Sequence, residues 1–175
     1  IDAIFITHEH IDHIRGLSII NKNYNIPIYI NKKTFKKVNN KLSSLNKDTI
    51  NLFEKKEFNI DDIKIKPFSV IHDAADPVGF SFFDKDGNKA TIVTDLGEIT
   101  EEVIKNVSNS DLLVVESNYD EQLIRYSPYP IEVVNRIISP NGHLSNLESL
   151  NLVSSLMDKG CLPFNISFIK SFAAM

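Results

Sequence analysis

Short apolar runs alternate along the chain with segments whose apolar residues recur every three or four positions. Continuous runs are typical of buried strands, and the wider spacing is typical of amphipathic helices. The runs predict strands over 1–7, 27–30, 63–70, 79–84, 90–94 and 112–115. The wider spacing predicts a helix from Asp12 that ends around 21–25, helices over 32–39, 131–138 and 145–158, and one that begins after Thr100. This alternation predicts an α/β fold with sheets inside and helices outside.

Several local signals fix where these elements begin and end. Asp86-Gly87 lies between two predicted strands and is a strong hairpin turn signal. Thr100 is the expected N-cap of the helix that follows it. Ser145 and Glu148 have the spacing of a capping box. Residues 40–59 are predicted to be a loop with one short strand.

Composition favours a soluble globular protein that is not embedded in a membrane. The 175 residues are 42% hydrophobic and 24% charged, which predicts a single domain over 1–175. No apolar stretch reaches the roughly 20 residues that cross a bilayer. The one cysteine, Cys161, cannot form an intrachain disulfide, which is compatible with the cytoplasm. We therefore expect a cytoplasmic protein.

Net charge bears on nucleic-acid binding in two opposite ways. The formal charge of −4 argues against binding through a broadly basic surface. Bound divalent ions, however, would add positive charge locally, where a phosphate is held. The densest basic patch comprises Lys32, Lys33, Lys36 and Lys37. It is either a solvated helix face or a contact for nucleic acid.

The first predicted strand leads directly into a cluster of metal-ligand side chains. His8, His10, Asp12 and His13 lie within six residues. Imidazole nitrogen and carboxylate oxygen suit zinc, manganese and iron, so the cluster predicts a metal site. A helical zincin motif is excluded, because Asp12 stands where the second histidine would be required. The alternative is a polar turn whose histidines are only solvated.

Other predicted strands also end at ligand-type residues. His72 follows strand 63–70, and Asp95 follows strand 90–94. All five histidines lie at or beside the ends of segments, outside the apolar runs. This distribution predicts that they serve one metal site. The alternatives are a neutral loop histidine for His72 and a turn carboxylate for Asp95.

His143 follows Gly142 and precedes the helix that begins near Ser145. Backbone amides at a helix start can bind an anion, and an imidazole beside them can assist. His143 therefore lies where backbone amides and an imidazole together could bind an anion. The alternative is a helix-entry histidine without a function.

Five segments together resemble a known family. They are His8-Glu9-His10-Ile11-Asp12-His13 after a strand, the segment 69–79, Val93-Thr94-Asp95-Leu96-Gly97, Glu116-Ser117-Asn118-Tyr119-Asp120 and Gly142-His143-Leu144-Ser145-Asn146. The chain from Ile1 to about Lys159 resembles the metallo-β-lactamase fold hydrolases. Within them it is similar to the small bacterial exonuclease-like branch, which acts on single-stranded DNA and is distantly related to ribonucleases Z and J. The resemblance implies a four-layer αβ/βα sandwich.

The resemblance also implies a set of functional residues. It assigns His8, His10 and His72 to a first ion, Asp12 and His13 to a second, and Asp95 as the bridge between them. The implied cofactors are two divalent ions, zinc or manganese, with iron also compatible. Asp12 and His143 are the implied catalytic residues, and Asn118, His143 and Ser145 the implied substrate-binding residues. The implied partner is single-stranded DNA or another phosphodiester.

Both ends of the sequence depart from the family pattern. The family begins with a β-hairpin before the position of Ile1 and has a further ligand histidine near its end, whereas the divergent tail 161–175 has none. We therefore expect a fold incomplete at its N-terminal hairpin and C-terminal strand, and weak catalysis. Two alternatives stay open: a thioester or lactam hydrolase of the same fold, and a truncated, inactive metal-binding remnant. The sequence contains no Gly-x-Ser-x-Gly elbow, the motif that would indicate covalent catalysis by serine.

Overall fold

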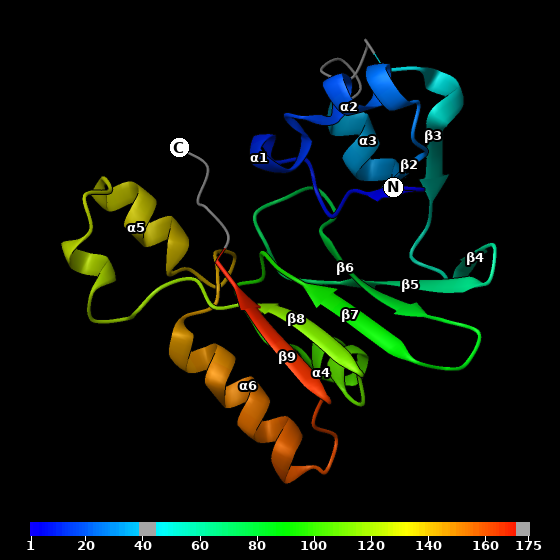
Figure 1. The fold of residues 1–175 in the computed structure, drawn as a ribbon. Coiled ribbons are helices and arrows are strands. Elements are labelled where there is room, and N and C mark those ends of the chain that lie inside the picture. The colour runs from blue at the N-terminus through cyan, green and yellow to red at the C-terminus, as the bar shows by residue number, and fades with distance from the viewer. Residues whose placement is uncertain (39–44, 171–175) are drawn as a thin grey trace. The chain divides into compact units, whose positions relative to one another are not determined.

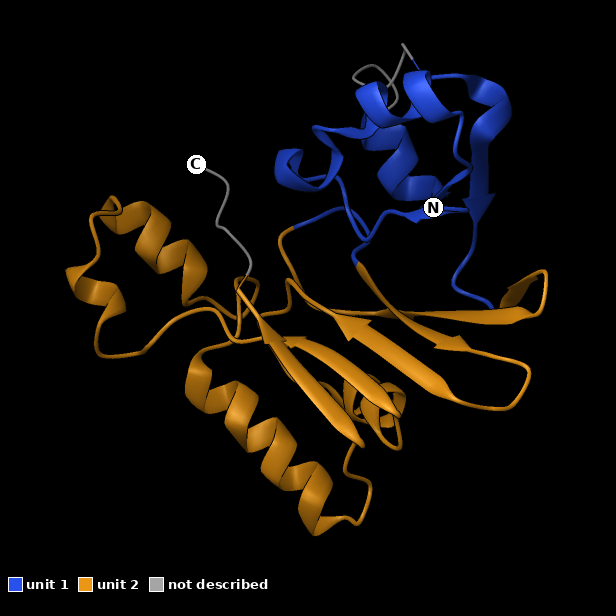
Figure 2. Ribbon diagram, in the orientation of Figure 1, with its two compact units in different colours: residues 1–56, 74–77, 174 blue, residues 57–73, 78–173, 175 orange. Residues whose placement is uncertain are grey.

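The computed structural model describes residues 1–38 and 45–170, which form two compact units (Figure 2). Of the described residues, unit 1 comprises those within 1–56 and 74–77, and unit 2 comprises 57–73 and 78–170. The predicted last residue of helix 32–39, loop residues 40–44 and tail residues 171–175 lie outside the described residues. The single domain over 1–175 stays a prediction.

Unit 1 is built on a parallel sheet. Its three strands have the order β1-β2-β3 (Figure 1). The elements are β1 (Ile4–Phe5), α1 (Ile11–Ile14), α2 (Leu17–Tyr24), β2 (Ile28–Asn31), α3 (Lys32–Val38), the short 3-10 helix η1 (Lys47–Thr49) and β3 (Ile50–Phe53). Buried side chains of Ile6, Ile14, Leu17, Ile28, Ile30, Val38 and Leu45 form its core. β1, β2 and α3 overlap the predicted strands 1–7 and 27–30 and the predicted helix 32–39.

The helix predicted from Asp12 to around 21–25 is two helices in the structure. α1 ends at Ile14, and α2 begins after Gly16, which is its N-cap without a side-chain hydrogen bond. Asp12 caps neither helix, because it lies inside α1. α2 ends where Asn25 adopts a left-handed conformation with φ of 52° and donates to the carbonyl of Asn21. Glycine is unfavourable in the interior of a helix, which accounts for the break at Gly16.

Unit 2 contains a mixed sheet of six strands in the order β4-β5-β6-β7-β8-β9. Neighbours from β4 to β7 are antiparallel, and β7, β8 and β9 run parallel. The strands are β4 (Phe58–Ile60), β5 (Ile63–Ser69), β6 (Val78–Phe83), β7 (Lys89–Val93), β8 (Leu112–Glu116) and β9 (Asn165–Ile169). The helices are α4 (Glu101–Val107), the 3-10 helix η2 (Ile124–Tyr126), α5 (Ile131–Ile137) and α6 (Asn146–Asp158). This confirms the predicted α/β class.

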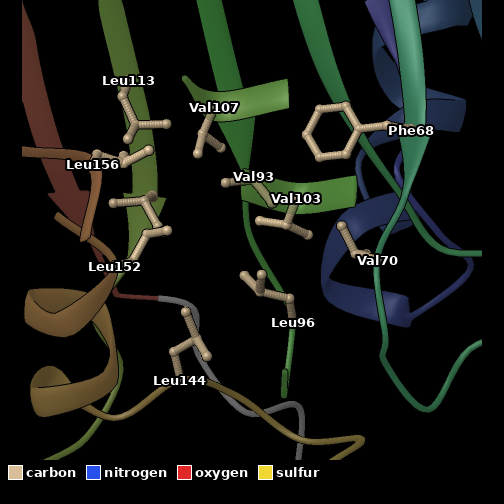
Figure 3. Packing of buried hydrophobic residues seen from close by; sticks show 11 residues of the cluster. Phe68, Val70, Val93, Leu96, Val103, Val107, Leu113, Leu144, Leu152 and Leu156 are labelled. Carbon is tan, nitrogen blue, oxygen red and sulfur yellow. The ribbon is translucent and has the colours of Figure 1, made fainter. Parts of the chain in front are cut away.

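The core of unit 2 lies between the sheet and its helices (Figure 3). Figure 3 shows Leu152 and Leu156 of α6 beside Leu113 of β8, and Val103 and Val107 of α4 beside Val93 of β7. Each of these side chains is at most 2% exposed. Full burial of one such side chain stabilises a protein by about 1.5–3 kcal/mol. The carboxyl ends of β7 and β8 therefore extend from a firmly packed layer.

The predicted turn and cap signals are confirmed. Strands β6 and β7 pair as a hairpin across Asp86-Gly87, and Gly87 has φ of 88°, which glycine adopts readily. The Thr100 hydroxyl accepts a hydrogen bond from the Val103 amide at 3.2 Å. Ser145 and Glu148 form the complete capping box of α6. Local chemistry of this kind is readable from adjacent residues.

Two strands differ from the sequence-based expectation. The tail predicted to diverge contains β9, which pairs in parallel with β8 from Leu112↔Asn165 to Glu116↔Ile169. Strand β4 lies in the segment predicted as a loop and pairs with β5. Both are short, and β9 is mostly exposed, so neither has a clear periodic signal.

Among the described helices, none has both the length and the apolar character needed to cross a membrane. The predicted cytoplasmic location stays a prediction.

Candidate metal centre

The strand directions of unit 2 bring three acidic or imidazole side chains to one edge of its sheet. Two antiparallel steps make β5 parallel to β7, and β8 is also parallel to β7. Carboxyl ends of parallel strands meet at the same edge. His72 follows β5, Asp95 follows β7, and Glu116 is the last residue of β8. The Gly97 amide donates to the Ile71 carbonyl at 2.8 Å, which ties the first two segments together.

His72, Asp95 and His143 form a buried cluster, here named the unit 2 cluster. One ligand atom from each lies within 4.8 Å of the others. The three residues are 7%, 2% and 5% exposed, respectively. Two imidazoles and a carboxylate are a donor set that zinc, manganese and iron accept. The structure thus brings two predicted ligands together and adds His143, which was predicted to act on substrate.

The tautomer of His72 is set by the backbone. Its Nδ1 lies 2.9 Å from the carbonyl oxygen of Gly142, which can only accept, so Nδ1 carries the proton. Nε2 therefore holds the lone pair of the neutral ring, and it lies 3.3 Å from Asp73 Oδ1. Burial lowers the pKa of His72, although the bond to Gly142 and the charges of Asp95 and Asp73 oppose this. The neutral ring is the form that binds metal.

Asp95 has a backbone conformation that is uncommon for its residue type. Its φ is 55°, in the left-handed region that aspartate tolerates better than most residues. Such strained positions persist where the surroundings impose them, and they cluster at functional sites. The close approach of Gly97 to Gly142 is one such constraint: a Cβ at Gly97 would lie 2.6 Å from the Gly142 nitrogen.

Glu116 is a fully buried carboxylate that joins three segments. Its Oε1 accepts from the Leu96 amide at 2.8 Å and from the Leu144 amide at 3.1 Å. Its Oε2 lies 3.0 Å from His143 Nδ1. Because a carboxylate accepts, Nδ1 of His143 donates this bond, which fixes the orientation of the ring. Glu116 is 0% exposed, so this network is shielded from water.

The surroundings of His143 favour its protonated form. Burial alone would lower the pKa of His143, but the hydrogen bond to Glu116 and the charges of Glu116 and Asp95 raise it above its ordinary value overall. His143 Nδ1 lies 3.6 Å from Asp95 Oδ1. His72 and His143 therefore differ: burial favours the neutral ring of His72, and two carboxylates favour the imidazolium of His143.

The start of α6 differs from the anion site expected from the sequence. The Ser145 amide donates to the Glu148 side chain at 2.7 Å, and the Glu148 amide donates to the Ser145 hydroxyl at 3.1 Å. The Asn146 amide donates to the Tyr119 carbonyl at 2.8 Å. These amides serve the protein's own groups, so His143 has Glu116 as its partner in place of an anion held by the helix start.

The two other predicted substrate-binding residues lie close to this network. Ser145 is 0% exposed, and its hydroxyl also donates to Glu121 at 2.8 Å. Asn118 follows β8, its amide donates to the Leu144 carbonyl at 3.1 Å, and its side chain lines a pocket. Ser145 therefore has a structural role as a cap, and contact of either residue with substrate stays a prediction.

In unit 1, the histidines after β1 gather around Thr7. The Thr7 hydroxyl lies 3.0 Å from His8 Nδ1 and 3.3 Å from His13 Nδ1. His8 Nε2 and His10 Nδ1 are 3.0 Å apart. Two nitrogens that bind one tetrahedral zinc at about 2.0–2.1 Å are about 3.3 Å apart. We name His8, His10 and His13 the unit 1 cluster.

Two carboxylates accompany the unit 1 cluster. Asp12 is exposed and lies 3.6 Å from His13 Nε2 through Oδ2. Glu9 accepts from the Ala75 amide through Oε1 at 2.8 Å. Its Oε2 is buried and has no hydrogen-bond partner among the described residues. Asp12 is thus close enough to share in the chemistry of His13, and its predicted catalytic and ligand roles stay predictions.

The donor chemistry of both clusters fits divalent metal. In unit 2 the donors are buried and close together, and the Gly142 carbonyl holds His72, which is the support that metal-binding histidines receive in proteins. In unit 1 the His8 and His10 nitrogens have nearly the separation of two ligands on one ion. The assignment of individual residues to a first, second or bridging position stays a prediction.

The predicted basic patch on α3 is partly neutralised. Lys32 Nζ lies 2.7 Å from Glu54 Oε1, and Lys33 Nζ lies 3.8 Å from Asp76 Oδ1. Acidic neighbours at half of its four lysines favour the reading of a solvated surface over that of a phosphate contact.

Sequence reasoning missed the part that Glu116 plays. Glu116 was noted only within a motif at a strand end, although a glutamate that directly follows Leu112-Leu113-Val114-Val115 is an unusual residue for the interior. That signal indicates a buried, partnered carboxylate. Asp73 and Arg136 were missed as well: they form an ion pair through two hydrogen bonds, which connects the segment after β5 to α5.

The chain is similar to two curated bacterial proteins. It is 32% identical over 149 residues to the exodeoxyribonuclease YycJ of Bacillus anthracis and 36% identical over 151 residues to the exodeoxyribonuclease WalJ of Streptococcus pneumoniae serotype 2. Each match covers 83% of this chain and 55% of the relative, so the chain spans about half the length of these relatives.

Solved structures give the same fold. Zn²⁺-bound PqqB from Methylobacterium extorquens superposes with a TM-score of 0.69 at 16% identity, over 95% of this chain and 61% of that one. Residues 1–164 also match the family described as the beta-lactamase superfamily domain. Because this match covers most of the chain, the protein belongs to the beta-lactamase superfamily.

Proposed function

We propose that this protein is a metal-dependent hydrolase that cleaves phosphodiester bonds in nucleic acid, and that it degrades single-stranded DNA from an end. The observation that carries the proposal is the unit 2 cluster, in which His72 and Asp95 are buried donors for a metal and His143, bonded to Glu116, favours its protonated form. The names of the two curated relatives support the choice of DNA as substrate.

The proposed cofactors are two divalent ions, with zinc and manganese as the first candidates. His8, His10, Asp12 and His13 of unit 1 and His72 and Asp95 of unit 2 are the proposed ligands. Bound divalent ions supply Lewis acidity, which activates water as a nucleophile near neutral pH and stabilises negative charge on phosphoryl oxygens. The chain's own groups then have to keep His72 neutral and its ring oriented: burial lowers the pKa of His72, and the bond to the Gly142 carbonyl orients the ring.

His143 is the proposed proton donor. Glu116 holds the Nδ1 proton of the ring at 3.0 Å and carries a charge that favours the imidazolium. In that form Nε2 also carries a proton, which can pass to the leaving oxygen as the phosphodiester bond breaks. Glu116 acts through His143 and is a positioning residue.

The test is hydrolysis by the purified chain after metal removal and reloading. End-labelled single-stranded DNA, duplex DNA and RNA are compared with a thioester and a chromogenic lactam, each with zinc, with manganese and with chelator. We expect metal-dependent shortening of single-stranded DNA from an end. Turnover of the thioester or lactam without cleavage of DNA would show instead that the protein is another hydrolase of this fold, and tight metal binding without turnover would indicate an inactive metal-binding protein.

A variant pair tests His143 as the proton donor. His143→Gln removes the proton donor, and it should lower kcat by about 10²–10⁴-fold, the usual contribution of general acid catalysis. Glu132→Ala on the exposed face of α5 is the matched control and should leave kcat unchanged. A His143→Gln variant with wild-type kcat would exclude His143 as the donor.

A further inference from the structure

A pocket of about 380 Å³ lies beside the Glu116–His143 network, entirely within unit 2. Its lining begins with Ser117, the residue after Glu116, and continues through Asn118 and Tyr119. The other side is formed by residues before and within α5, the helix seen in yellow-green in Figure 1. The volume is within the range of about 300–1,000 Å³ typical of small-molecule sites. The proposed mechanism uses no residue of this pocket.

The walls of the pocket are aromatic and aliphatic. Tyr119 and Tyr129 are half-buried and pack against a small core that includes Ile124 and Ile137. All four residues line the pocket. Burial and the charges of Glu148, Glu121 and Glu116 raise the pKa of Tyr119 to about 12, so its hydroxyl stays protonated. Two rings on a packed support provide flat apolar surface together with hydroxyl groups.

Polar groups are distributed over the remaining lining. Asn118 and Asn146 contribute amide side chains, and Lys170 contributes a positive charge. The Ser127 hydroxyl is buried and has no hydrogen-bond partner among the described residues, although it lines the pocket. A buried hydroxyl without a partner costs free energy, and a ligand that supplies one would relieve this cost.

We propose that this pocket binds one unstacked nucleobase of a nucleic-acid strand. Bases of single strands stack on aromatic side chains, and amides and hydroxyls recognise their polar edges. Asn118, Tyr119 and Ser127 offer these groups together, and Lys170 supplies the charge that a flanking phosphate requires. The inference rests on the proposed nuclease function and deepens it, because it makes the base a determinant of which nucleotide is held beside His143.

The test is binding of two dinucleotides that have the same phosphates, measured with chelator present so that neither is cleaved. One dinucleotide has both bases and the other has an abasic sugar at one position. The quantity of interest is the ratio of the two dissociation constants. We expect the ligand with both bases to bind at least about fivefold more tightly, the lower limit for loss of base stacking. Equal dissociation constants, or no binding of either ligand at millimolar concentration, would overturn the proposal.

Variants test whether the preference for the dinucleotide with both bases arises in this pocket. Tyr119→Leu keeps apolar volume but removes the flat ring, so the ratio should fall towards one, whereas Tyr119→Phe should keep it. Lys170→Glu should weaken both ligands equally, because it removes charge without affecting the base. Tyr126→Ala is the control, since Tyr126 is 87% exposed and outside the lining. If Tyr119→Leu is folded by thermal melting and keeps the full ratio, the base binds elsewhere and the proposal fails.

The outcome is independent of catalysis. If the protein cleaves single-stranded DNA but binds both dinucleotides equally, the proposed function is supported and base binding by the pocket is overturned. A chain that prefers the ligand with both bases but cleaves nothing supports the pocket and contradicts the proposed function.

Discussion

The unit 1 and unit 2 clusters use the same donor atoms but are built in opposite ways. The unit 1 cluster comes from one stretch of six residues after a strand of two residues, and His10 and His13 are only half-buried. The unit 2 cluster joins His72, Asp95 and His143, which are far apart in sequence, and all are buried. A local cluster needs a suitable turn, whereas a distributed one needs the whole sheet edge to be correct.

This difference shows where the fold and the site depend on each other. In unit 2 one buried carboxylate, Glu116, binds the segments that contain Leu96, His143 and Leu144. In unit 1, the histidines contact side chains of their own short segment, which are one another, Thr7 and Asp12. Removal of a single group should therefore affect folding more strongly in unit 2 than in unit 1.

The largest effect is expected for Glu116→Ala. It leaves the buried Leu96 and Leu144 amides and the His143 ring without their acceptor, and each buried unsatisfied group costs about 1–3 kcal/mol. The free energy of unfolding should fall by about 3–5 kcal/mol, measured by denaturant titration. Glu132→Ala, on an exposed turn of α5, should change it by less than about 0.5 kcal/mol. Equal stabilities of the two variants would remove the contrast between the clusters.

Metal affinity is the next most sensitive quantity. His72→Ala should lower it by about 100-fold or more, because a ligand already oriented by the Gly142 carbonyl is lost. His10→Ala should lower it less, because His10 is half-buried and its orientation rests on other side chains. Metal per chain is measured by mass spectrometry after dialysis. Lys36→Ala is the control for general misfolding and should retain all bound metal.

Two glycine substitutions sharpen the comparison at the level of backbone packing. A Cβ at Gly142 would lie 2.2 Å from the Ile137 carbonyl oxygen, whereas a Cβ at Gly16 of unit 1 would lie 3.9 Å from the Ile20 side chain. Gly142→Ala should destabilise the protein by about 1–3 kcal/mol through forced backbone movement. Gly16→Ala should be neutral. Thermal melting of both variants tests this, and a neutral Gly142→Ala would show that the segment before His143 adapts.

The smallest effect is expected on the surface of α3. Lys36→Ala and Lys37→Ala should leave KM for single-stranded DNA unchanged, because nearby Lys32 and Lys33 have acidic neighbours and the patch resembles a solvated face. KM is measured at low salt, where phosphate contacts contribute most. A rise in KM that disappears at high salt would identify the patch as a DNA contact.

Local parts of the fold were predictable because their chemistry lies within a few residues. The Asp86-Gly87 hairpin, the Thr100 cap and the Ser145 capping box each depend on neighbours in sequence. Strand β9 was not predictable in the same way. Asn165–Ile169 forms a strand only because β8 offers a parallel partner, and a parallel partner more than 40 residues earlier leaves no periodic signal.

The candidate site likewise has a local part that was predictable and a distributed part that was not. His8, His10 and His13 are recognisable as ligands from their spacing alone, and their proximity in the structure agrees with it. The proximity of His72 to Asp95 could be inferred only from strand ends. The partnership of His143 with Glu116 could not be read at all, because it depends on two turns that meet at the sheet edge.

The segment from Tyr119 to His143 leaves the edge of the unit 2 sheet and returns to it at the same point. The Asn118 amide binds the Leu144 carbonyl at 3.1 Å, and Tyr119 and Ser145 form an isolated parallel bridge. The anchors of this segment are therefore fixed by the sheet edge and are independent of its own length. Each doubling of the length of a flexible loop costs only about 0.6 kcal/mol of closure entropy. The residues between Tyr119 and α5 can therefore vary in length at small cost, whereas α5 itself is tied to the site, because the His143 amide donates to the Ile137 carbonyl at 2.9 Å.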